Sequence, residues 1–384
     1  MSIGSNGPNG DAVASMLIRK YVAEAQKADQ FGTDELEPIL LGLFGEVGSV
    51  MAAAKKHRRD KEAFVGYRAA VEEEFGDVLW YFAALCRRLG IDVEQVFWAA
   101  AGGGSYTLGI AASDLAEGPL AQIASAPAHA NLDELLLRLG QATAPVLNVK
   151  SADSNSFAKM VAFADCYLQC LQATGVQFAA VARSNLTKSL GRFVDSNPEL
   201  LPSFDSEYEA EEQLPSDFEI VVTQRKSGQS YLQMNGVFIG DPLTDNIEDP
   251  DGYRFHDVFH FAHAAVLHWS PVFRALIKHK RKSNKKVDEA QDGGRAIVIE
   301  EGLTAWIFSR AKTLNFFQEH QRLSFDLLKT IGQFVSGYEV AECPLKLWED
   351  AILQGYSVFR EVRANSGGRI IGNRNTRRIT YRAK

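Results

Sequence analysis

The sequence is poor in cysteine, and its four cysteines form no motif. Cys86, Cys166, Cys170 and Cys343 give no CxxC pair in a chain of 384 residues. A disulfide framework is therefore not expected, and a reducing cytosol is the default compartment. Cys166 and Cys170 lie one helical turn apart, which is more typical of core residues than of metal ligands.

Long apolar runs, a leader and an excess of positive charge are also missing. No apolar run approaches the roughly 20 residues of a membrane span, and the N-terminus does not have the pattern of a signal peptide. The net charge of −7 gives no general reason to expect nucleic-acid binding. These features predict a cytoplasmic protein with neither a membrane nor a nucleic acid as partner. The length predicts two or three domains.

Acidic residues gather in two clusters within residues 45–77. Glu46 belongs to the first cluster, and Glu72, Glu73, Glu74 and Asp77 belong to the second. On a helix Glu74 and Asp77 share one face, and Glu73 lies one turn before Asp77. Carboxylates among packing residues must be paired or hold a cation, and Mg²⁺ suits carboxylate oxygens together with phosphate and water. The alternative is a pair of amphipathic helices whose acids face water.

Local signals place the helices around these clusters. Asp34 and Glu37 have the spacing of a capping box, which predicts the start of the helix that carries Glu46. The polar run 55–62 is predicted to be a solvated connection. The following helix is expected to end at Gly90, since glycine favours the left-handed conformation at a helix C-terminus.

The helical pattern of this region occurs a second time. Two segments of residues 132–185 match the spacing of two segments within 36–101. Alignment of Gly175 with Gly90 places Lys159 where the first copy has an acid. This predicts an internal repeat of a helical hairpin whose second copy cannot bind metal.

The composition changes after residue 193. Nine acidic residues, no basic residue and three prolines occupy 195–219, which predicts an extended, solvated linker over 194–217. Residues 219–240 contain β-branched residues with SG and NG turns, which predict a small antiparallel ribbon. The tail 363–384 carries seven basic residues and no acid, and it is expected to pair with the acidic linker, to dock on the ribbon or to contact a polyanion.

Histidines form the other candidate site. His256, His260 and His263 fall at i, i+4 and i+7, within about 60° of one helical face. Together with Glu300 and Glu301 they predict a metal centre or an acid–base pocket, and the alternative is a polar network that ties helices together. The nearby basic run KHKRKSNKK would attract an anion, which favours a nucleotide or phosphate as ligand over a bare metal.

Two short motifs carry a resemblance to a known family. The first is EVGS, with Glu46 and, three residues later, Ser49. The second is EFGD, with Glu74 and Asp77. Residues 32–193 resemble the MazG-like, all-α nucleoside triphosphate pyrophosphohydrolases, whose pattern is E-x-x-E followed by E-x-x-D. Ser49 stands where that pattern has its second glutamate.

The family pattern ends in an N-x-x-K-x-x-x-R stretch. This stretch is missing after the first copy and occurs after the second as NLTKSLGR, with Asn185, Lys188 and Arg192. The two copies therefore carry complementary halves of the pattern. A composite site within one chain would replace the site of a homodimer of single copies, although a homo-oligomer stays open.

The resemblance implies cleavage of a (deoxy)nucleoside triphosphate between its α- and β-phosphates, which gives a monophosphate and pyrophosphate. The cofactor it implies is Mg²⁺, with Mn²⁺ as an alternative. The metal ligands it implies are Glu46, Glu74 and Asp77, which are also the catalytic set. Because Ser49 supplies no carboxylate, Glu73 is the candidate fourth metal ligand, and the alternative is that the site has no fourth ligand. Lys188 and Arg192 would contact phosphate oxygens, and Asn185 would hold a base or a sugar hydroxyl.

The second half resembles the C-terminal domain that is appended to some MazG-like proteins. The predicted fold is mainly α, with a MazG-like helical bundle from two repeats and a mostly helical C-terminal domain with a small β ribbon. The predicted divisions are a tail (1–15), repeat 1 (16–104), a connector with repeat 2 (105–193), the acidic linker (194–217) and the His-rich domain (218–384).

Two other functions stay open beside the hydrolase. One is a nucleotide-sensing protein that hydrolyses its ligand weakly because Ser49 replaces a carboxylate. The other is an enzyme whose chemistry lies in the His-rich domain.

Overall fold

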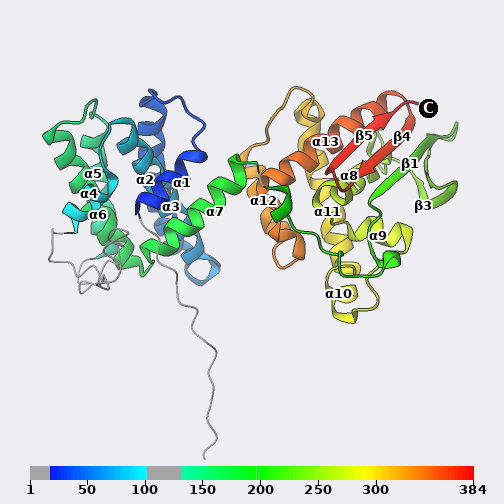
Figure 1. Ribbon diagram of the computed structural model, residues 1–384, viewed down its shortest axis with the longest axis horizontal. Coiled ribbons are helices and arrows are strands. Elements are labelled where there is room, and N and C mark those ends of the chain that lie inside the picture. The colour runs from blue at the N-terminus through cyan, green and yellow to red at the C-terminus, as the bar shows by residue number, and fades with distance from the viewer. Residues whose placement is uncertain (1–17, 102–130, 196) are drawn as a thin grey trace, which may run out of the picture. The chain divides into compact units, whose positions relative to one another are not determined.

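The computed structural model describes residues 18–101, 131–195 and 197–384 (Figure 1). The chain divides into two compact units, unit 1 (Met1–Val194) and unit 2 (Asp195–Lys384). The predicted tail and most of the predicted connector lie outside the described residues. The mainly α class with a small antiparallel sheet is confirmed.

Unit 1 is a helical bundle built from two consecutive groups. The first group comprises α1 (Ile18–Lys27), α2 (Glu37–Asp60), the 3₁₀ turn η1 (Lys61–Ala63), α3 (Tyr67–Arg88) and α4 (Val93–Ala100). The second comprises α5 (Leu132–Val146), α6 (Ser154–Thr174) and α7 (Phe178–Phe193). α2 packs on α3 as α5 packs on α6, and α3 packs on α7 as α6 packs on α4. These contacts are reciprocal between the two groups, which are called the first and the second copy below, and the internal repeat itself stays a prediction.

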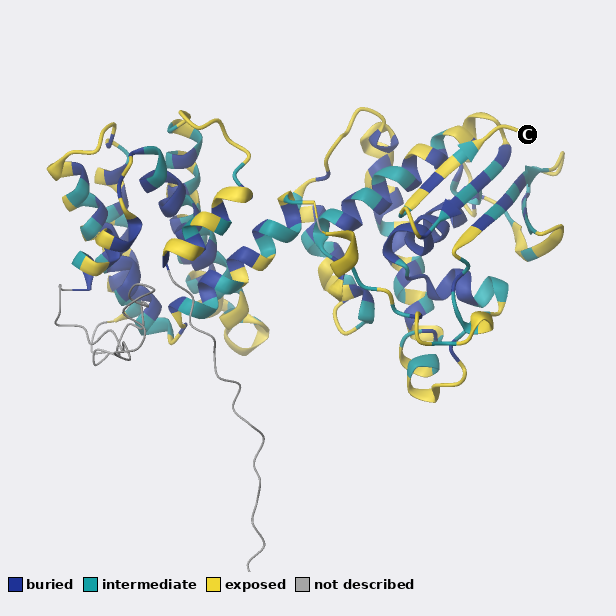
Figure 2. Cartoon of the chain, in the orientation of Figure 1, coloured by how far each residue is buried: buried dark blue, intermediate teal, exposed yellow. Residues whose placement is uncertain are grey.

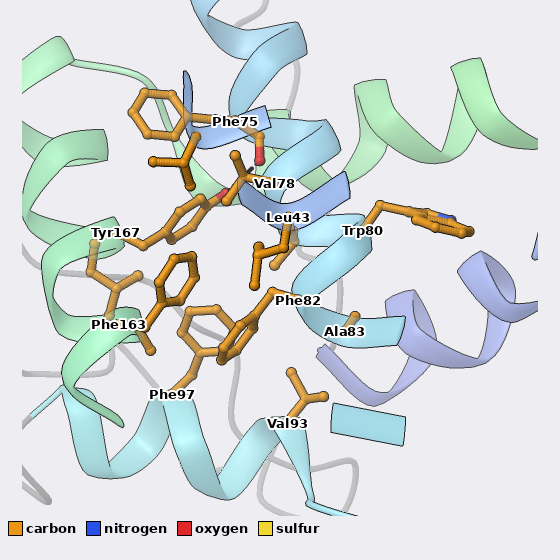
Figure 3. Close-up of a cluster of buried hydrophobic side chains, with 14 of the residues drawn as sticks. Leu43, Phe75, Val78, Trp80, Phe82, Ala83, Val93, Phe97, Phe163 and Tyr167 are labelled. Carbon is orange, nitrogen blue, oxygen red and sulfur yellow. Dashed lines mark hydrogen bonds between the residues drawn. The ribbon is translucent and has the colours of Figure 1, made fainter. Parts of the chain in front are cut away.

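Aromatic side chains fill the core of unit 1. Figure 3 shows Phe82 of α3 stacked on Phe163 of α6, with ring centroids 4.9 Å apart, and Phe97 of α4 packed edge-on against Phe82. The Tyr167 hydroxyl donates a hydrogen bond of 2.9 Å to the Phe75 carbonyl, so the two copies are joined inside this core. Such burial is the main favourable contribution to folding.

Two local predictions in unit 1 are wrong and one is confirmed. α2 begins at Glu37 without a side-chain cap, because Leu36 takes the N-cap position and a proline occupies the first turn. The run predicted as a connection continues α2 to Asp60, where its basic side chains face the negative end of the helix dipole. Gly90 adopts the left-handed conformation, with φ of 67°, at the end of α3.

Within the described residues, one helix reaches the length and hydropathy of a membrane span, which the sequence analysis did not expect. α2 continued by η1 has a mean hydropathy of 1.3 over its most apolar window, of which 28% is buried. Ile39, Leu43, Val47 and Val50 of this helix lie in the core of unit 1. A single such helix is weak evidence for a membrane, because the core helices of other proteins pass the same test.

Unit 2 combines helices with one antiparallel sheet, whose strand order is β3-β2-β1-β4-β5. Its strands are β1 (Asp217–Gln224), β2 (Ser230–Met234), β3 (Val237–Leu243), β4 (Gly367–Asn373) and β5 (Arg378–Arg382). Its α-helices are α8 (Asp257–Ala262), α9 (Pro271–Ile277), α10 (Lys285–Ala290), α11 (Gly294–Thr313), α12 (Phe325–Phe334) and α13 (Leu345–Ala364). Its shorter turns are η3 (Pro198–Leu200), η4 (Ala210–Glu212), η5 (Tyr253–Phe255), the π-helical η6 (His263–Leu267), η7 (Asn315–Phe317) and η8 (Glu339–Glu342).

The helices of unit 2 cover one face of the sheet. α8 and α13 pack on β4 and β5, and buried residues alternate with accessible ones along β1 (Figure 2). The Phe218 ring of β1 packs against the rings of Phe261 and Phe273. α8, which carries the predicted His260 and is flanked by His256 and His263, therefore runs through the core of this unit.

The acidic segment and the basic tail are parts of unit 2. Asp205 is 2% exposed and binds Arg274 and Arg374, with N–O distances of 2.6 Å to each. Leu214 is also buried, so the prediction of a solvated linker is wrong for this part of the segment. The tail docks on the predicted ribbon, because β4 pairs with β1 in a register that places Asp217 opposite Asn373.

Candidate functional site

Three carboxylates from adjacent helices meet in unit 1. Glu46 comes from α2, and Glu74 and Asp77 come from α3. Each offers one oxygen, and these three oxygens lie within 4.8 Å of one another. α2 and α3 pack along each other, which brings the single acid of α2 to the E-x-x-D pair. All three residues are partly buried, so the group resembles a coordination site more than a solvated acidic face.

The electrostatics of the group favour a bound cation. Burial, and then repulsion from Asp77 and Glu74, raises the pKa of Glu46 to about 7. Lys188 and the Ser49 hydroxyl act in the opposite direction and favour the charged carboxylate. Ser49 thus interacts with Glu46 without supplying a carboxylate of its own. A divalent cation would relieve the repulsion, and oxygen donors are the ligands that Mg²⁺ prefers.

The second copy supplies an amide and an ammonium group to the same place. Asn185 Nδ2, on α7, donates to Asp77 Oδ1 at 3.1 Å. Lys188 Nζ lies 2.5 Å from Asp77 Oδ2 and 2.9 Å from Glu73 Oε1. Tyr21 Oη donates to Asn185 Oδ1 at 2.9 Å, which fixes the orientation of the amide. Residues of both copies therefore meet at Asp77.

A glycine allows this close approach of α7 to α3. A Cβ atom on Gly76 would lie 2.9 Å from Asn185 Cβ, closer than side-chain atoms can pack. Gly76 is the second x position of the E-x-x-D motif, and a side chain there would push Asn185 away from Asp77. This gives a steric reason for the sequence EFGD.

Two predicted site residues are placed differently from the other five. Glu73 is outside the group of three carboxylates and accepts a hydrogen bond from Lys188, so it neighbours the site as a partner of that lysine. Arg192 lies one turn beyond Lys188, is 5% exposed and holds its guanidinium over the Phe193 ring. This burial makes Arg192 less accessible to a phosphate than the sequence analysis expected.

Aromatic residues beside the carboxylates were missed by sequence reasoning. Phe31, Trp80 and Tyr81 form a cluster in which the Trp80 and Tyr81 ring centroids are 5.0 Å apart. Burial, and then Glu46 and Asp77, raises the pKa of Tyr81, which places its hydroxyl in the field of the carboxylates. The available signal was the Trp80–Tyr81 pair, which begins three residues after Asp77.

The histidines and acids of unit 2 also meet. Glu300 of α11 is fully buried and accepts hydrogen bonds from His263 Nδ1 (2.9 Å), Ser270 Oγ (3.0 Å) and the Val272 amide (2.9 Å). Although burial opposes it, contact with His260 and His263 holds the pKa of Glu300 well below its usual range. Glu300 is thus a charged anchor inside the helical core.

The basic run 278–286 contains one fully buried arginine, whereas Lys278, Lys282, Lys285 and Lys286 are exposed. Arg281 is fully buried, and its guanidinium binds Asp292 at 2.7 Å and Glu339 at 2.6 Å. Because these lysines are accessible to an anion, the preference of the histidine cluster for a nucleotide or phosphate stays a prediction. Buried arginine–carboxylate pairs of this kind hold loops in place.

Fold and sites together define a mainly α protein with a carboxylate cluster in one unit and a histidine–carboxylate cluster in the other. Residues 199–384 match the family model of the MazG C-terminal domain, which relates unit 2 to the MazG family. The match does not extend to unit 1, so the resemblance of that unit rests on its motifs. No solved structure matches the chain.

A similar curated protein is the Gene 37 protein of Mycobacterium phage L5. It is 35% identical over 63 residues, which is 16% of this chain and 55% of that protein. The chain thus spans about half the length of the curated relative that it matches. The printed name of this relative states no activity.

Proposed function

We propose that the protein is a Mg²⁺-dependent nucleotide pyrophosphohydrolase of the cytoplasm, which converts a nucleoside triphosphate to a monophosphate and pyrophosphate. One observation carries the proposal: the acids of the first copy and the Asn185–Lys188 pair of the second meet at Asp77. This composite arrangement unites in one unit the two halves of the motif pattern. The match of unit 2 to the MazG C-terminal domain supports the same family.

The side chains fit the proposed chemistry. Glu46, Glu74 and Asp77 would hold Mg²⁺, which supplies charge neutralisation of the triphosphate and acidifies a bound water. When a triphosphate binds, Lys188 would leave its carboxylate partners and bind a phosphate oxygen instead, at a similar N–O distance. Asn185, held by Tyr21, would orient Asp77 rather than contact a base, since its amide already donates to that carboxylate.

A nucleobase is proposed to stack on the aromatic cluster of Phe31, Trp80 and Tyr81. The Tyr81 hydroxyl lies in the field of Glu46 and Asp77, and in the same cluster Phe31 is 36% exposed while Trp80 is almost fully buried. An accessible ring backed by the buried Trp80 and the half-buried Tyr81 offers a flat, rigid surface to a base. Stacking accepts every base, so this surface alone does not set base preference.

The test uses the full-length protein, Mg²⁺ and a panel of canonical and modified nucleoside triphosphates, with the products separated by ion-exchange chromatography. We expect monophosphate and pyrophosphate in equal amounts, and loss of turnover in Glu74→Gln and Asp77→Asn. Glu72→Gln is the matched control, because Glu72 lies on the same helix but outside the group of three carboxylates. Turnover that survives EDTA, or release of a single phosphate, would contradict the proposal.

A second candidate function follows from Ser49. Because this residue supplies a hydroxyl in place of a carboxylate, the centre has fewer anionic ligands than the family pattern. A protein that binds nucleotide without cleaving it would show Mg²⁺-dependent nucleotide binding by calorimetry and no pyrophosphate. Restoration of hydrolysis in Ser49→Glu would then identify the missing carboxylate as the cause.

A further inference from the structure

Two histidines of unit 2 direct the same ring nitrogen at one carboxylate. His256, at the N-cap of α8, and His260, one turn later, both face Glu301 of α11. The distances from Glu301 Oε2 are 3.5 Å to His256 Nε2 and 3.4 Å to His260 Nε2. One ligand atom from each of the three residues lies within 4.8 Å of the other two, so a single ion between them could contact each residue.

The other nitrogen of each ring faces an oxygen acceptor. His256 Nδ1 lies 2.9 Å from the Tyr253 carbonyl oxygen, and the Tyr253 ring is stacked on the imidazole. His260 Nδ1 lies 3.0 Å from Glu300 Oε1. A carbonyl or carboxylate at Nδ1 places the ring proton there and leaves the Nε2 lone pair free for a metal. His256 therefore has the outer hydrogen-bonding partner that is usual for metal-binding histidines, and His260 has a carboxylate oxygen within reach of the same ring atom.

Glu300 is a positioning residue for this set and not a fourth ligand. Its two oxygens already accept bonds from Ser270, from the Val272 amide and from His263, and it is inaccessible to solvent. The side chain of its neighbour Glu301 is 39% exposed. A metal at Glu301 would thus keep coordination positions open toward solvent, whereas a metal at Glu300 would have none.

The buried His260 makes no hydrogen bond of acceptable geometry within the described part of the chain. His260 is inaccessible to solvent, and neither of its ring nitrogens makes a hydrogen bond of acceptable geometry, in spite of the short distances to both acids. An imidazole in such a place loses free energy unless another partner satisfies it. The π-helical turn η6 begins at His263, directly after this turn of α8, and such turns are frequent at functional sites.

We propose that unit 2 carries a site for a divalent transition-metal ion, with His256 Nε2, His260 Nε2 and a Glu301 oxygen as its ligands. Two imidazoles with one carboxylate suit Zn²⁺, Mn²⁺ or Fe²⁺, and they do not suit Mg²⁺, which prefers oxygen donors. The positions left open would take water or an anionic oxygen ligand. The proposal is independent of the hydrolase activity assigned to unit 1.

The competing arrangement is a salt-bridge network without metal. In it a protonated His260 would lie between Glu300 and Glu301, and these acids raise the pKa of His260 above its ordinary value in spite of burial. The two arrangements make opposite predictions for added metal, because a protonated imidazole cannot coordinate.

The test uses full-length protein that carries Glu74→Gln and Asp77→Asn, so that the carboxylate cluster of unit 1 does not contribute. The protein is stripped with a chelator, dialysed against Zn²⁺ or Mn²⁺ with Mg²⁺ in excess, and its metal content is measured by mass spectrometry. We expect one transition-metal ion per chain, and an affinity at least tenfold weaker in His256→Gln and in Glu301→Gln. Co²⁺ in place of Zn²⁺ should give visible absorption bands that these substitutions change.

Matched controls separate ligand loss from unfolding. Glu289→Gln removes an exposed acid of α10, and His320→Gln removes an exposed histidine, so both should keep the full metal content. Glu301→Gln is the decisive variant, because its partly exposed side chain can be neutralised without opening the core. Absence of bound metal in the parent, or metal content unchanged in Glu301→Gln, would overturn the proposal in favour of the salt-bridge network.

Discussion

Replacement of Lys188 by methionine tests whether the two copies act as one site. The change keeps most of the side-chain volume and removes the charge that lies between Glu73 and Asp77. Although burial opposes it, these two acids raise the pKa of Lys188, so the wild-type side chain is an ammonium at neutral pH. In the hydrolase the ammonium must leave Asp77, at least in part, when metal and triphosphate bind.

The expected change in kcat/KM follows from the contacts that Lys188 can make. A hydrogen bond to a charged group contributes about 1.5–3 kcal/mol, so loss of one phosphate contact predicts a kcat/KM lower by about 10- to 150-fold. If Lys188 serves only as a counterion, its removal instead leaves the carboxylates more negative. Mg²⁺ would then bind more tightly, and kcat/KM at saturating Mg²⁺ would change little.

The assay measures kcat/KM at several fixed Mg²⁺ concentrations for the wild type, Lys188→Met and Lys150→Met. Lys150 is an exposed lysine of the same unit and serves as the control. A phosphate contact predicts that the deficit of Lys188→Met persists at saturating Mg²⁺. An undiminished kcat/KM at saturating Mg²⁺, with a lower Mg²⁺ requirement, would refute the phosphate role.

Two further predictions concern stability. Gly76→Ala should lower the free energy of unfolding by about 1–3 kcal/mol and reduce turnover, because the new methyl group meets Asn185. Gly48→Ala has open space around it and should raise the free energy of unfolding by about 0.5–1 kcal/mol. Urea unfolding and turnover measurements check both substitutions. Burial, and then the charges of Arg377 and Arg374, lowers the pKa of His268 to about 4. The folded state therefore binds this proton less well than the unfolded chain, so the contribution of His268 is complete above about pH 6.5 and falls by about 2 kcal/mol by pH 5. Urea unfolding at pH 7 and pH 5 should show a smaller decline in His268→Gln, and an equal decline would contradict the assignment.

Local signals in the sequence were sufficient for most helices and for the first strands. Gly90 and Gly175 end helices in the left-handed conformation because only glycine adopts it without strain. The turns at Gly228 and Gly236, also left-handed, set the β1–β2–β3 meander. In each case the information lies within a few residues of the feature that it predicts.

Partners that lie far apart in the sequence were not predictable in the same way. β4 pairs with β1 across about 150 residues, and an alternating strand pattern does not state which strand it will join. The acidic segment looked solvated because acids are usually exposed. Asp205 is buried only because Arg274 and Arg374 approach it from distant parts of the chain.

In the candidate sites, too, the local spacing was predictable from the sequence and the long-range packing was not. Spacing alone predicts that Glu74 and Asp77 share a face, but the approach of Lys188 depends on how α7 packs on α3. Adjacent residues on a helix point about 100° apart, so Glu300 and Glu301 face different surroundings. The sequence could group them with the histidines, and only the packing of α11 shows that the first is buried and the second accessible.

The two clusters differ in donor type, and this difference makes the metal itself a probe of which unit performs chemistry. The unit 1 cluster offers only carboxylate oxygens, whereas the proposed unit 2 site offers two imidazole nitrogens and one carboxylate. Mn²⁺ suits both donor sets, so activity with Mn²⁺ alone does not assign the reaction. Mg²⁺ suits the oxygen cluster and Zn²⁺ suits the nitrogen-containing one. Turnover supported by Mg²⁺ and lost in Glu74→Gln therefore assigns the chemistry to unit 1. Turnover that needs Zn²⁺ and is lost in Glu301→Gln assigns it to unit 2, and would reduce the carboxylate cluster to substrate binding.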